Sequence, residues 1–462
     1  MVPAMRAKTP HQCEGCGAGA PRWLGRCPAC GEWGSVVPIA PRAVGASPAG
    51  EPPVPIGRVA ATAADRIPTG VGELDRVLGG GLVPGSVTLL VGEPGMGKST
   101  LLLQALGAMA AAGARCLLVG AEESPEQVRL RAERVGTLEP ALLLVAETSM
   151  PAVLAHVEHV APAVLAVDSI QAVSEPTLAS APGSVGQVRD CAYQLVGLAK
   201  ARGLPVVLVG HVTKEGTLAG PRTLEHVVDT VIAFDGDRHH TLRFLHALKH
   251  RFGSTQEVGL LEMGELGLAG VPDPSALFLS DRRTGIAGSA VAPVIDGARP
   301  MLVEVQALVA PPASGPPRRS ASGLDAARLS LLLAVLEQRA GVPVASADVY
   351  ASVAGGVRVT EPGADLAVAL AVGSARLDVP VPPTTIVLGE VGLGGELRQV
   401  PQAARRLAEA ARLGFERVVG PLALPAIPGV EVTPVATLRE ALQMVLGGAE
   451  GHDRAISRGR AA

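Results

Sequence analysis

Apolar runs alternate with helical segments between residues 63 and 270. The run "SVTLLVG" leads into the helical segment "KSTLLLQALGAMAAAG", and further apolar runs follow as "ARCLLVG", "ALLLVA", "AVLAVD" and "LPVVLVG". Short buried strands joined by crossover helices produce this pattern. It predicts an α/β domain in which a mostly parallel sheet carries helices on both faces.

The pattern changes from about Ile286 onward. "MLVEVQALV" alternates as a strand, "RLSLLLAVLEQRAGV" and "EPGADLAVALAVGSARL" have helical character, and "TTIVLGEVGLGGELRQVPQAARRLAEAARLG" predicts a strand, a glycine-rich turn and a helix. We therefore expect an α+β domain over residues 271–446. Residues 36–62, rich in Pro, Ala and Gly, predict a linker, and residues 447–462 predict a disordered tail.

Composition narrows the classes of protein. At 462 residues and 48% hydrophobic, the chain can build two or three packed domains. The net charge of −3 provides no overall basic field, so contact with nucleic acid needs a local basic patch. Aromatic residues make up 2% of the chain, which argues against a surface built mainly from base-stacking rings.

Targeting and membrane-spanning signals are missing from the sequence. The first residues, "MVPAMRAKTPHQ", lack the apolar core of a signal peptide, and no stretch has the roughly eighteen apolar residues that a spanning helix needs. The sequence predicts a cytoplasmic protein with no membrane partner.

Two C-x-x-C pairs separated by ten residues lie near the N-terminus, in "CEGCGAGAPRWLGRCPAC". Four thiolates at this spacing predict a structural zinc module over residues 10–35, with ligands Cys13, Cys16, Cys27 and Cys30. A pair of redox dithiols is the alternative, and His11 is a competing ligand. We expect Trp23 and Trp33 to pack over the cysteine turns, because so small a module needs apolar area as well as metal.

The segment "GEPGMGKST" matches a P-loop, since it follows a predicted strand and opens a predicted helix. Its glycines allow backbone N–H groups to surround phosphate, Lys98 would meet the β and γ oxygens of ATP, and the Ser99 hydroxyl would ligate Mg²⁺. The predicted nucleotide contacts are Gly92, Glu93, Pro94, Gly95, Met96, Gly97, Lys98, Ser99 and Thr100.

Three strand ends carry candidate catalytic side chains. Asp168 ends "AVLAVD" and is the natural Walker B acid for Mg²⁺, the alternative being an aspartate that caps the next segment. Glu122, in "VGAEES", is our candidate for the general base, and Glu123 is a candidate cap for the helix that starts near Pro125. His211 ends a later strand, either as a sensor of the γ-phosphate or as an uninvolved surface histidine.

Taken together, the cysteine module ending in "CPACGEW", the entry "TGVGELDRVLGGGLVPGSVTLLVGEPGMGKST", the "GAEES" strand end, "GPRTLEHVVDTVIAFDGD" and "KHRFGS" resemble the bacterial RadA/Sms family. These are RecA-like ATPases of DNA recombination and repair, and the resemblance covers nearly the whole chain in the family's order. The family's signature pentapeptide is usually Lys-Asn-Arg-Phe-Gly. Here His250 stands at its second position, and the flanking charges of Lys249 and Arg251 are kept.

The resemblance implies a homo-hexameric ring that carries single-stranded or branched DNA and works with a RecA-type recombinase. Lys249 and Arg251 would then reach a neighbouring subunit and stabilise charge on its γ-phosphate; the alternative is a basic turn on a solvated face. The segment "SEPTLASAPGSVGQVRD" resembles the mobile DNA-contacting loop of RecA-type cores, with Arg189 as one phosphate contact, although a plain surface loop would also fit.

The C-terminal half is similar to the proteolytic domain of Lon proteases. Aligned with that domain, the serine position falls on Asp365 and the lysine position near Ala404, so neither catalytic role can be filled. The resemblance then implies an inactive domain that serves as an assembly platform. Local positive charge makes it a candidate second DNA surface, through Arg318, Arg319, Arg405, Arg406 and Arg412.

The function expected from the sequence is therefore a DNA-dependent ATPase motor that acts on recombination intermediates by branch migration or strand unwinding. One alternative is a signalling ATPase or autokinase of the KaiC type, which shares the RecA-like core and the "EES" strand end. The other is an ATP-dependent peptidase of the Lon type.

Overall fold

The structure is a computed structural model, and it describes residues 11–13, 19–20, 22–38, 55–58, 65–211, 224–236, 241–312 and 316–447. The chain divides into two compact units, Met1–Ala63 and Ala64–Ala462. Most of the expected linker and nearly all of the expected tail lie outside the described residues, and the boundary expected near residue 270 stays a prediction.

The N-terminal unit contains a small antiparallel sheet in the order β2-β1-β3, formed by β1 (His11–Cys13), β2 (Gly19–Ala20) and β3 (Val36–Pro38). A short 3-10 turn, η1, covers Ile56–Arg58. The buried residues Ala20, Cys27 and Val36, with Leu24 beside them, form its small core. The expectation that the tryptophans pack over the cysteine turns is wrong, because Trp23 is 62% exposed and Trp33 75% exposed.

The sheet that follows has nine strands in the order β12-β11-β10-β9-β4-β8-β7-β5-β6. Neighbouring strands are parallel through β9, β4, β8, β7, β5 and β6, as the apolar runs predict for β4 to β8. The pairs β9–β10, β10–β11 and β11–β12 are antiparallel. Their bounds are β4 (Val87–Gly92), β5 (Cys116–Gly120), β6 (Leu142–Val145), β7 (Val164–Asp168), β8 (Val206–His211), β9 (Thr230–Gly236), β10 (Leu242–His250), β11 (Val258–Gly264) and β12 (Gly267–Gly270).

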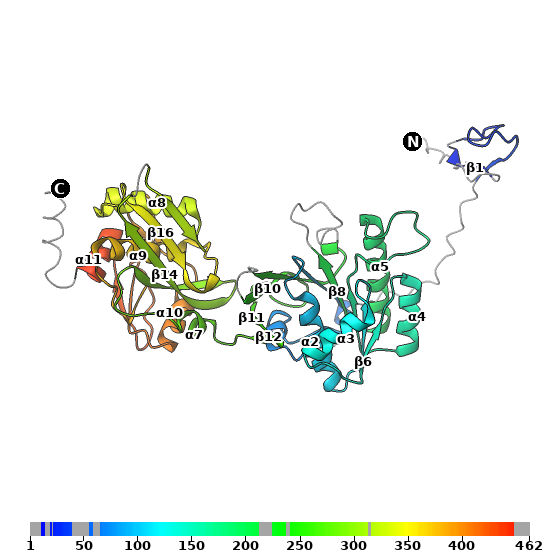
Figure 1. The fold of residues 1–462 in the computed structure, drawn as a ribbon, viewed down its shortest axis with the longest axis horizontal. Coiled ribbons are helices and arrows are strands. Elements are labelled where there is room, and N and C mark those ends of the chain that lie inside the picture. Colours follow the sequence, from blue (N-terminus) through cyan, green and yellow to red (C-terminus); the bar gives the residue numbers. More distant parts are fainter. Residues whose placement is uncertain are drawn as a thin grey trace. The chain divides into compact units, whose positions relative to one another are not determined.

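Helices cover both faces of this sheet (Figure 1), and alternate residues of each strand point to opposite faces. Leu89 packs with the helices α4 and α5, whereas Leu90 packs with α1 and α2. The helices are α1 (Gly72–Val77), α2 (Lys98–Ala111), α3 (Pro125–Arg134), α4 (Met150–Val160) and α5 (Val185–Arg202). The strand order places the P-loop strand between β8 and β9, which is the RecA-like arrangement expected from the sequence.

Two local predictions near these helices need correction. Ser124, and not Glu123, caps α3: its hydroxyl accepts the Gln127 N–H while the Gln127 side chain accepts the Ser124 N–H. The segment "SEPTLASAPGSVGQVRD" is also not a loop throughout. Its last residues belong to α5, which begins at Val185, so Arg189 lies on a helix. The buried Gln187 side chain bonds backbone groups of Glu175, Leu178 and Ser180, so it organises the loop before the helix.

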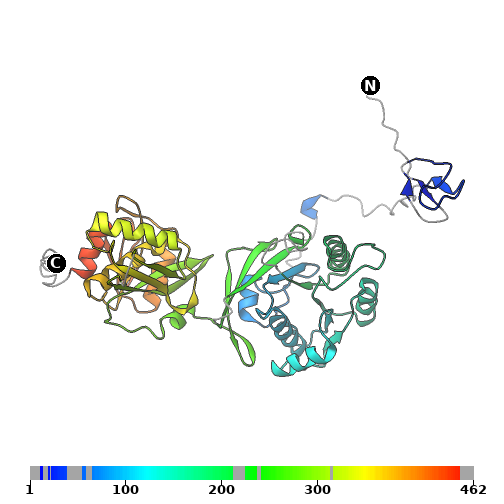
Figure 2. The ribbon, with the colours of Figure 1, turned by 45° about the horizontal axis from the view of Figure 1, so that its top comes forward.

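The remaining residues form a seven-stranded mixed sheet in the order β15-β16-β14-β13-β17-β20-β21, seen in Figure 2 with its helices. The strands are β13 (Ser289–Asp296), β14 (Arg299–Ala310), β15 (Arg319–Ser322), β16 (Asp348–Val353), β17 (Thr385–Val387), β20 (Arg417–Gly420) and β21 (Glu431–Pro434), with the separate pair β18 (Glu390–Val391) and β19 (Leu397–Arg398). The helices are α7 (Pro274–Leu279), α8 (Ala326–Val335), α9 (Asp365–Leu377), α10 (Ala403–Arg412) and α11 (Leu438–Leu446), with the π-helical segment η2 (Leu336–Ala340) and the 3-10 turns η3 (Ala354–Gly356) and η4 (Pro362–Ala364).

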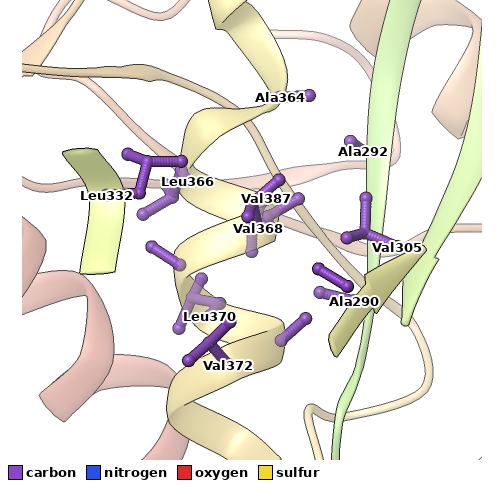
Figure 3. Close-up of a cluster of buried hydrophobic side chains, with 14 of the residues drawn as sticks. Ala290, Ala292, Val305, Leu332, Ala364, Leu366, Val368, Leu370, Val372 and Val387 are labelled. Atoms are coloured by element: carbon purple, nitrogen blue, oxygen red, sulfur yellow. The ribbon is translucent and has the colours of Figure 1, made fainter. Parts of the chain in front are cut away.

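Helix α9 is the centre of the α+β core. Figure 3 shows its apolar side chains with Leu332 of α8 and with residues of the sheet, among them Ala290 and Val305. Every residue from Asp365 to Ser374 of α9 is buried. A helix that is covered on several sides has to be apolar all round, which agrees with the unbroken apolar run "LAVALAVG" in its first turns.

A buried ion pair joins this second sheet to the first. Arg299, at the start of β14, pairs with Glu73 of α1 and also donates to the carbonyls of Val258, Val271 and Pro272. Glu73 accepts a further hydrogen bond from the Leu260 N–H. Since both charges have multiple partners, the cost of burying them is offset by specific contacts.

Candidate functional site: a P-loop ATPase centre

The P-loop connects β4 to α2 and requires glycine at its ends. A Cβ on Gly92 would lie 2.4 Å from the backbone carbonyl oxygen of Phe234, which cannot move aside. Gly97 has a φ of 106°, a conformation that other residues rarely adopt. The loop can therefore expose its backbone N–H groups to an anion at the N-terminus of α2.

Lys98 lies within its own loop. Its Nζ donates to the carbonyl oxygens of Gly92 and Glu93, each at 2.8 Å, and the side chain is buried. Burial lowers the pKa of Lys98, while the carboxylates of Asp168 and Glu122 act in the opposite direction. The ammonium group is thus positioned at the loop and electrostatically linked to the two acids.

Arg243 is a contact of the P-loop that the sequence analysis did not identify. This buried residue of β10 donates from Nε to the Met96 carbonyl oxygen at 3.1 Å. The sequence does contain a hint of this role: Arg243 interrupts the apolar segment "TLRFLHAL", and an arginine buried in a core normally has a hydrogen-bond partner there.

Asp168 and Ser99 meet at the carboxyl ends of the strands. Burial raises the pKa of Asp168, and a hydrogen bond with the Ser99 side chain opposes that shift. Both residues, together with Glu122, line a small cavity of about 30 Å³. Hydroxyl and carboxylate oxygens are the ligands that Mg²⁺ prefers, and the cavity is large enough for an ion with water, so these residues fit the expected magnesium site.

Glu122 and His211 are brought together although 89 positions separate them in the chain. Glu122 Oε2 lies 3.3 Å from His211 Nε2, and Oε1 accepts a hydrogen bond from the Ser169 hydroxyl. The hydrogen bond with His211 is the largest cause of the lowered pKa of Glu122. Glu122 is consequently held as an anion at the cavity, whereas Glu123 is paired with Arg131 of α3.

Lys249 and Arg251 lie near the N-terminal ends of the parallel strands, whereas the P-loop of the same chain lies at their C-terminal ends. In the antiparallel register, Arg243 at the start of β10 pairs with Gly236, and Lys249 near its end pairs with Val231. Strand β9 in turn pairs its first residue, Thr230, with Thr88 near the start of β4. The structure therefore does not bring Lys249 and Arg251 to the site of Lys98, Glu122, Asp168 and His211.

The segment 249–251, here called the basic turn, is fixed by contacts within the chain. Lys249 Nζ donates to the carbonyls of Glu225 and Val228, and Arg251 Nη1 lies 3.0 Å from Asp229 Oδ1. The other oxygen of the buried Asp229 accepts the Val87 N–H, at the start of the P-loop strand, at 3.0 Å. Asp229 thereby links the basic turn to β4, a role that sequence reasoning missed.

His250, at the position where the family usually has asparagine, packs inside the same turn. Its Nδ1 lies 3.0 Å from the Thr230 hydroxyl, and burial lowers its pKa. Arg66 holds the turn from outside by donating to the carbonyl oxygens of Phe252 and Leu78. Histidine thus fits the position without displacing the charges on either side of it.

The N-terminal unit has the backbone of a metal-binding turn around its second cysteine pair. The Gly31 N–H donates to the Cys27 carbonyl oxygen at 2.9 Å, and Gly31 has a φ of 77°, as expected for the glycine after C-x-x-C. Cys27 is buried and Cys30 is exposed, and Cys13 ends β1. Cys16 lies outside the described residues. The thiols at Cys27 and Cys30 fit a soft tetrahedral ion such as zinc.

The position expected for a peptidase serine holds an ion pair. Asp365, at the start of α9, is buried, pairs with Arg328 of α8 and accepts the Val391 N–H at 3.1 Å. Ala404 lies on α10 and is exposed. A carboxylate that is engaged in this way supplies no nucleophilic hydroxyl.

Only part of the expected second basic surface is accessible. Arg406 is 2% exposed and pairs with Glu361, and Arg412 pairs with Asp273 and Glu409. Arg318, Arg319 and Arg405 are exposed. The interpretation of Arg406 as a surface charge is therefore wrong, because the amphipathic helix α10 turns that side chain toward the core.

Two family models match the chain: "AAA domain" over residues 53–217 and "Rubredoxin metal binding domain" over residues 11–38. The DNA repair protein RadA of Bacillus subtilis is 45% identical over 456 residues, covering 96% of this chain and 100% of that protein. The DNA repair protein RadA of Mycolicibacterium smegmatis is 46% identical, with 95% and 97% covered. A solved structure, the KaiC-like protein PH0186 from Pyrococcus horikoshii OT3, matches with a TM-score of 0.39 and 20% identity over 45% of this chain and all of that one.

These matches agree with the chemistry of the two sites. ATP with Mg²⁺ is the nucleotide that the P-loop domain hydrolyses, and zinc is the metal of the N-terminal ribbon. Across the part of the chain that the structure describes, no helix combines the length and the apolar character needed to cross a membrane.

Proposed function

Because this chain belongs to the RadA family of DNA repair proteins, we propose that it is a DNA-dependent ATPase motor that remodels recombination intermediates by branch migration or strand unwinding. It would act on single-stranded or branched DNA as a homo-hexameric ring, together with a RecA-type recombinase. Neither the KaiC-like autokinase nor the Lon-type peptidase gains support, since the full-length relatives are named DNA repair proteins and Asp365 is held in an ion pair.

The observation that carries this proposal is the separation of two parts of one catalytic centre. The P-loop, Glu122, Asp168 and His211 lie at the C-terminal ends of the parallel strands, and Lys249 and Arg251 lie near the N-terminal ends. Phosphoryl transfer is accelerated by a second cation at the γ-phosphate besides the P-loop lysine. A neighbouring subunit can supply Lys249 and Arg251, which is why the site favours an assembly over a monomer.

Each residue then has a defined task. Backbone N–H groups of the P-loop, other than at Pro94, which has none, and the Lys98 ammonium would bind the phosphates, while Ser99 and Asp168 would hold Mg²⁺. Glu122 orients and deprotonates the attacking water, and His211 passes the state of the site to the chain that follows β8. Cys13, Cys16, Cys27 and Cys30 hold the zinc ion that maintains the ribbon.

ATP turnover with and without single-stranded DNA tests the proposal. We expect DNA to raise the turnover of the unaltered protein, and Lys249→Ala to lose most of that increase, because a cation at the γ-phosphate contributes on the order of 10³-fold to such reactions. Arg202→Ala is the matched control, since that exposed cation on α5 pairs only with Glu158 among the contacts seen. Undiminished DNA-stimulated turnover in Lys249→Ala would contradict the proposed role.

A further inference from the structure

Both tryptophans of the chain are exposed on the zinc ribbon. The sequence contains two, Trp23 and Trp33, and their side chains are 62% and 75% exposed. The core of the ribbon is formed by Ala20, Cys27 and Val36 instead. Contiguous exposed apolar surface marks an interaction site, whereas single exposed apolar residues are common, so the question is whether these two rings share one surface.

The two rings border one surface. A Cβ on Gly25 would lie 3.7 Å from Trp23 Cη2 and 3.8 Å from Trp33 Cζ3, so both indoles flank the same glycine. The Arg26 guanidinium carbon lies 5.8 Å from the centre of the Trp33 ring. Arg22 is exposed beside Trp23 in the chain. We name Arg22, Trp23, Gly25, Arg26 and Trp33 the tryptophan patch.

The backbone holds the tryptophan patch in place before any partner binds. The Gly34 N–H donates to the Gly25 carbonyl oxygen at 2.8 Å, and Arg26 and Trp33 form an antiparallel bridge. Arg26 Nε donates to the Gly31 carbonyl oxygen at 2.8 Å, which fixes the guanidinium near the ring. Aromatic side chains that are already ordered lose little entropy on binding.

We propose that the tryptophan patch binds unpaired bases of single-stranded DNA by stacking them on Trp23 and Trp33, with Arg22 and Arg26 contacting the phosphates. This inference rests on the proposed DNA-dependent function and gives that function a second DNA site outside the P-loop domain. Exposed rings beside arginines provide a stacking platform together with a cation for the backbone. Residues 22–38 contain two arginines and the single carboxylate of Glu32, so their charge also favours an anionic partner.

Stacking capacity is concentrated at this patch. The other exposed aromatic side chains of the described residues lie apart from one another: Tyr193 on α5, Tyr350 on β16, and Phe252 in the turn after β10, where its ring packs edge-on against His250. A double-stranded partner would hide its bases from the indoles, so the patch should distinguish single strands from duplexes. A protein partner would use the same rings through apolar contact, and the experiment below separates the two.

Intrinsic fluorescence reports on the patch alone, because the chain has no other tryptophan. The full-length protein is titrated with a fluorescein-labelled thymidine oligonucleotide of about 20 residues, and the anisotropy of the label records binding anywhere on the protein. We expect tryptophan emission to be quenched in parallel with binding, and an abasic oligonucleotide of equal length to bind more weakly and quench less. Binding without any change in tryptophan emission would overturn the inference while leaving the proposed function standing. Absence of binding altogether would contradict both.

Substitutions at Trp33 test whether the tryptophan patch itself binds the oligonucleotide. Trp33→Ala should weaken oligonucleotide binding about tenfold, the usual effect of removing one stacking ring, and Trp33→Phe should recover most of it. Leu266→Ala, which removes a 78% exposed apolar side chain elsewhere, is the matched control and should bind normally. Zinc content of each variant confirms that the ribbon is folded. Equal binding by Trp33→Ala and the unaltered protein, with zinc retained, would show that the rings serve a partner other than DNA.

Discussion

Glu122 and Glu123 are adjacent carboxylates with different surroundings. Both line the cavity shared with Asp168, but Glu122 contacts Ser169 and His211, whereas Glu123 is paired with Arg131 of the next helix. The sequence could rank them only by their distance from the strand end. The partners that separate a candidate base from a structural acid come from other strands and helices.

The pH dependence of ATP turnover should reveal the Glu122–His211 contact. A base acts while it is deprotonated, so turnover falls as pH falls through the pKa of Glu122, which the His211 hydrogen bond lowers below the ordinary value. His211→Ala removes the largest cause of that lowering. The acidic limb of the rate profile should therefore move to higher pH.

The control for that profile is His159→Ala, since His159 is exposed on α4 and contacts neither acid. Turnover is measured across pH at saturating ATP and DNA, so that binding does not distort the limb. An unchanged acidic limb in His211→Ala would exclude Glu122 as the group that titrates.

At the scale of elements, the contact between α1 and β14 depends on two buried charges. The side chains of Glu73 and Arg299 are 6% and 8% exposed, and both also bond backbone groups of the strands and turns between them. Such a pair contributes little compared with apolar residues of the same size, but removal of one partner leaves the other charge buried. The pair therefore fixes which surfaces meet more than it adds net stability.

Arg299→Ala should lower the free energy of unfolding by about 3–5 kcal/mol, because Glu73 would remain buried without its cation. The double variant Glu73→Gln with Arg299→Met should recover most of the loss, since glutamine can still accept the Leu260 N–H and no charge is left buried. Denaturant unfolding measures both. Arg283→Ala, an exposed arginine nearby in sequence, is the control and should change stability by less than about 0.5 kcal/mol.

At the scale of the whole molecule, the position of the basic turn decides what a single chain can do. The β9–β10 register puts Lys249 and Arg251 beyond the reach of their own P-loop, and Asp229 connects Arg251 to the strand that carries that loop. A shift of the basic turn would therefore be felt at the nucleotide site of the same subunit. In a ring, this provides a physical route from one site to the next.

Mixing two inactive variants tests the shared site directly. Lys98→Ala disables the P-loop but keeps the basic turn, and Lys249→Ala removes a cation of the basic turn while leaving the contact of Arg251 and Asp229 with the P-loop strand in place. If the turn acts in trans, an equal mixture exchanged into common rings should regain activity at about a quarter of its interfaces. If each subunit completes its own site, the mixture should stay as inactive as its parts, and a mass near 46.8 kDa for the active species would lead to the same conclusion.

The sequence by itself determined what local patterns encode. The alternation of apolar and helical segments predicted the parallel strands β4 to β8 and the helices between them, but not the antiparallel strands β9 to β12. The spacing of glycines and cysteines located the P-loop and the ribbon, because each of these features depends on residues a few positions apart. Because Asp168, Glu122 and His211 each stand at the end of a predicted parallel strand, the sequence also predicts that they lie on the same side of the sheet.

Only the tertiary structure decided how distant residues pair. The contacts of Glu122 with His211, Arg251 with Asp229, Arg243 with Met96 and Arg299 with Glu73 join segments between 22 and 226 positions apart. They follow from strand order and register, which periodicity does not specify. The same limit explains the errors: whether Arg406 or Trp33 is buried depends on which face of an element meets the core, and among the described residues of the ribbon it is Ala20, Cys27 and Val36 that are buried together.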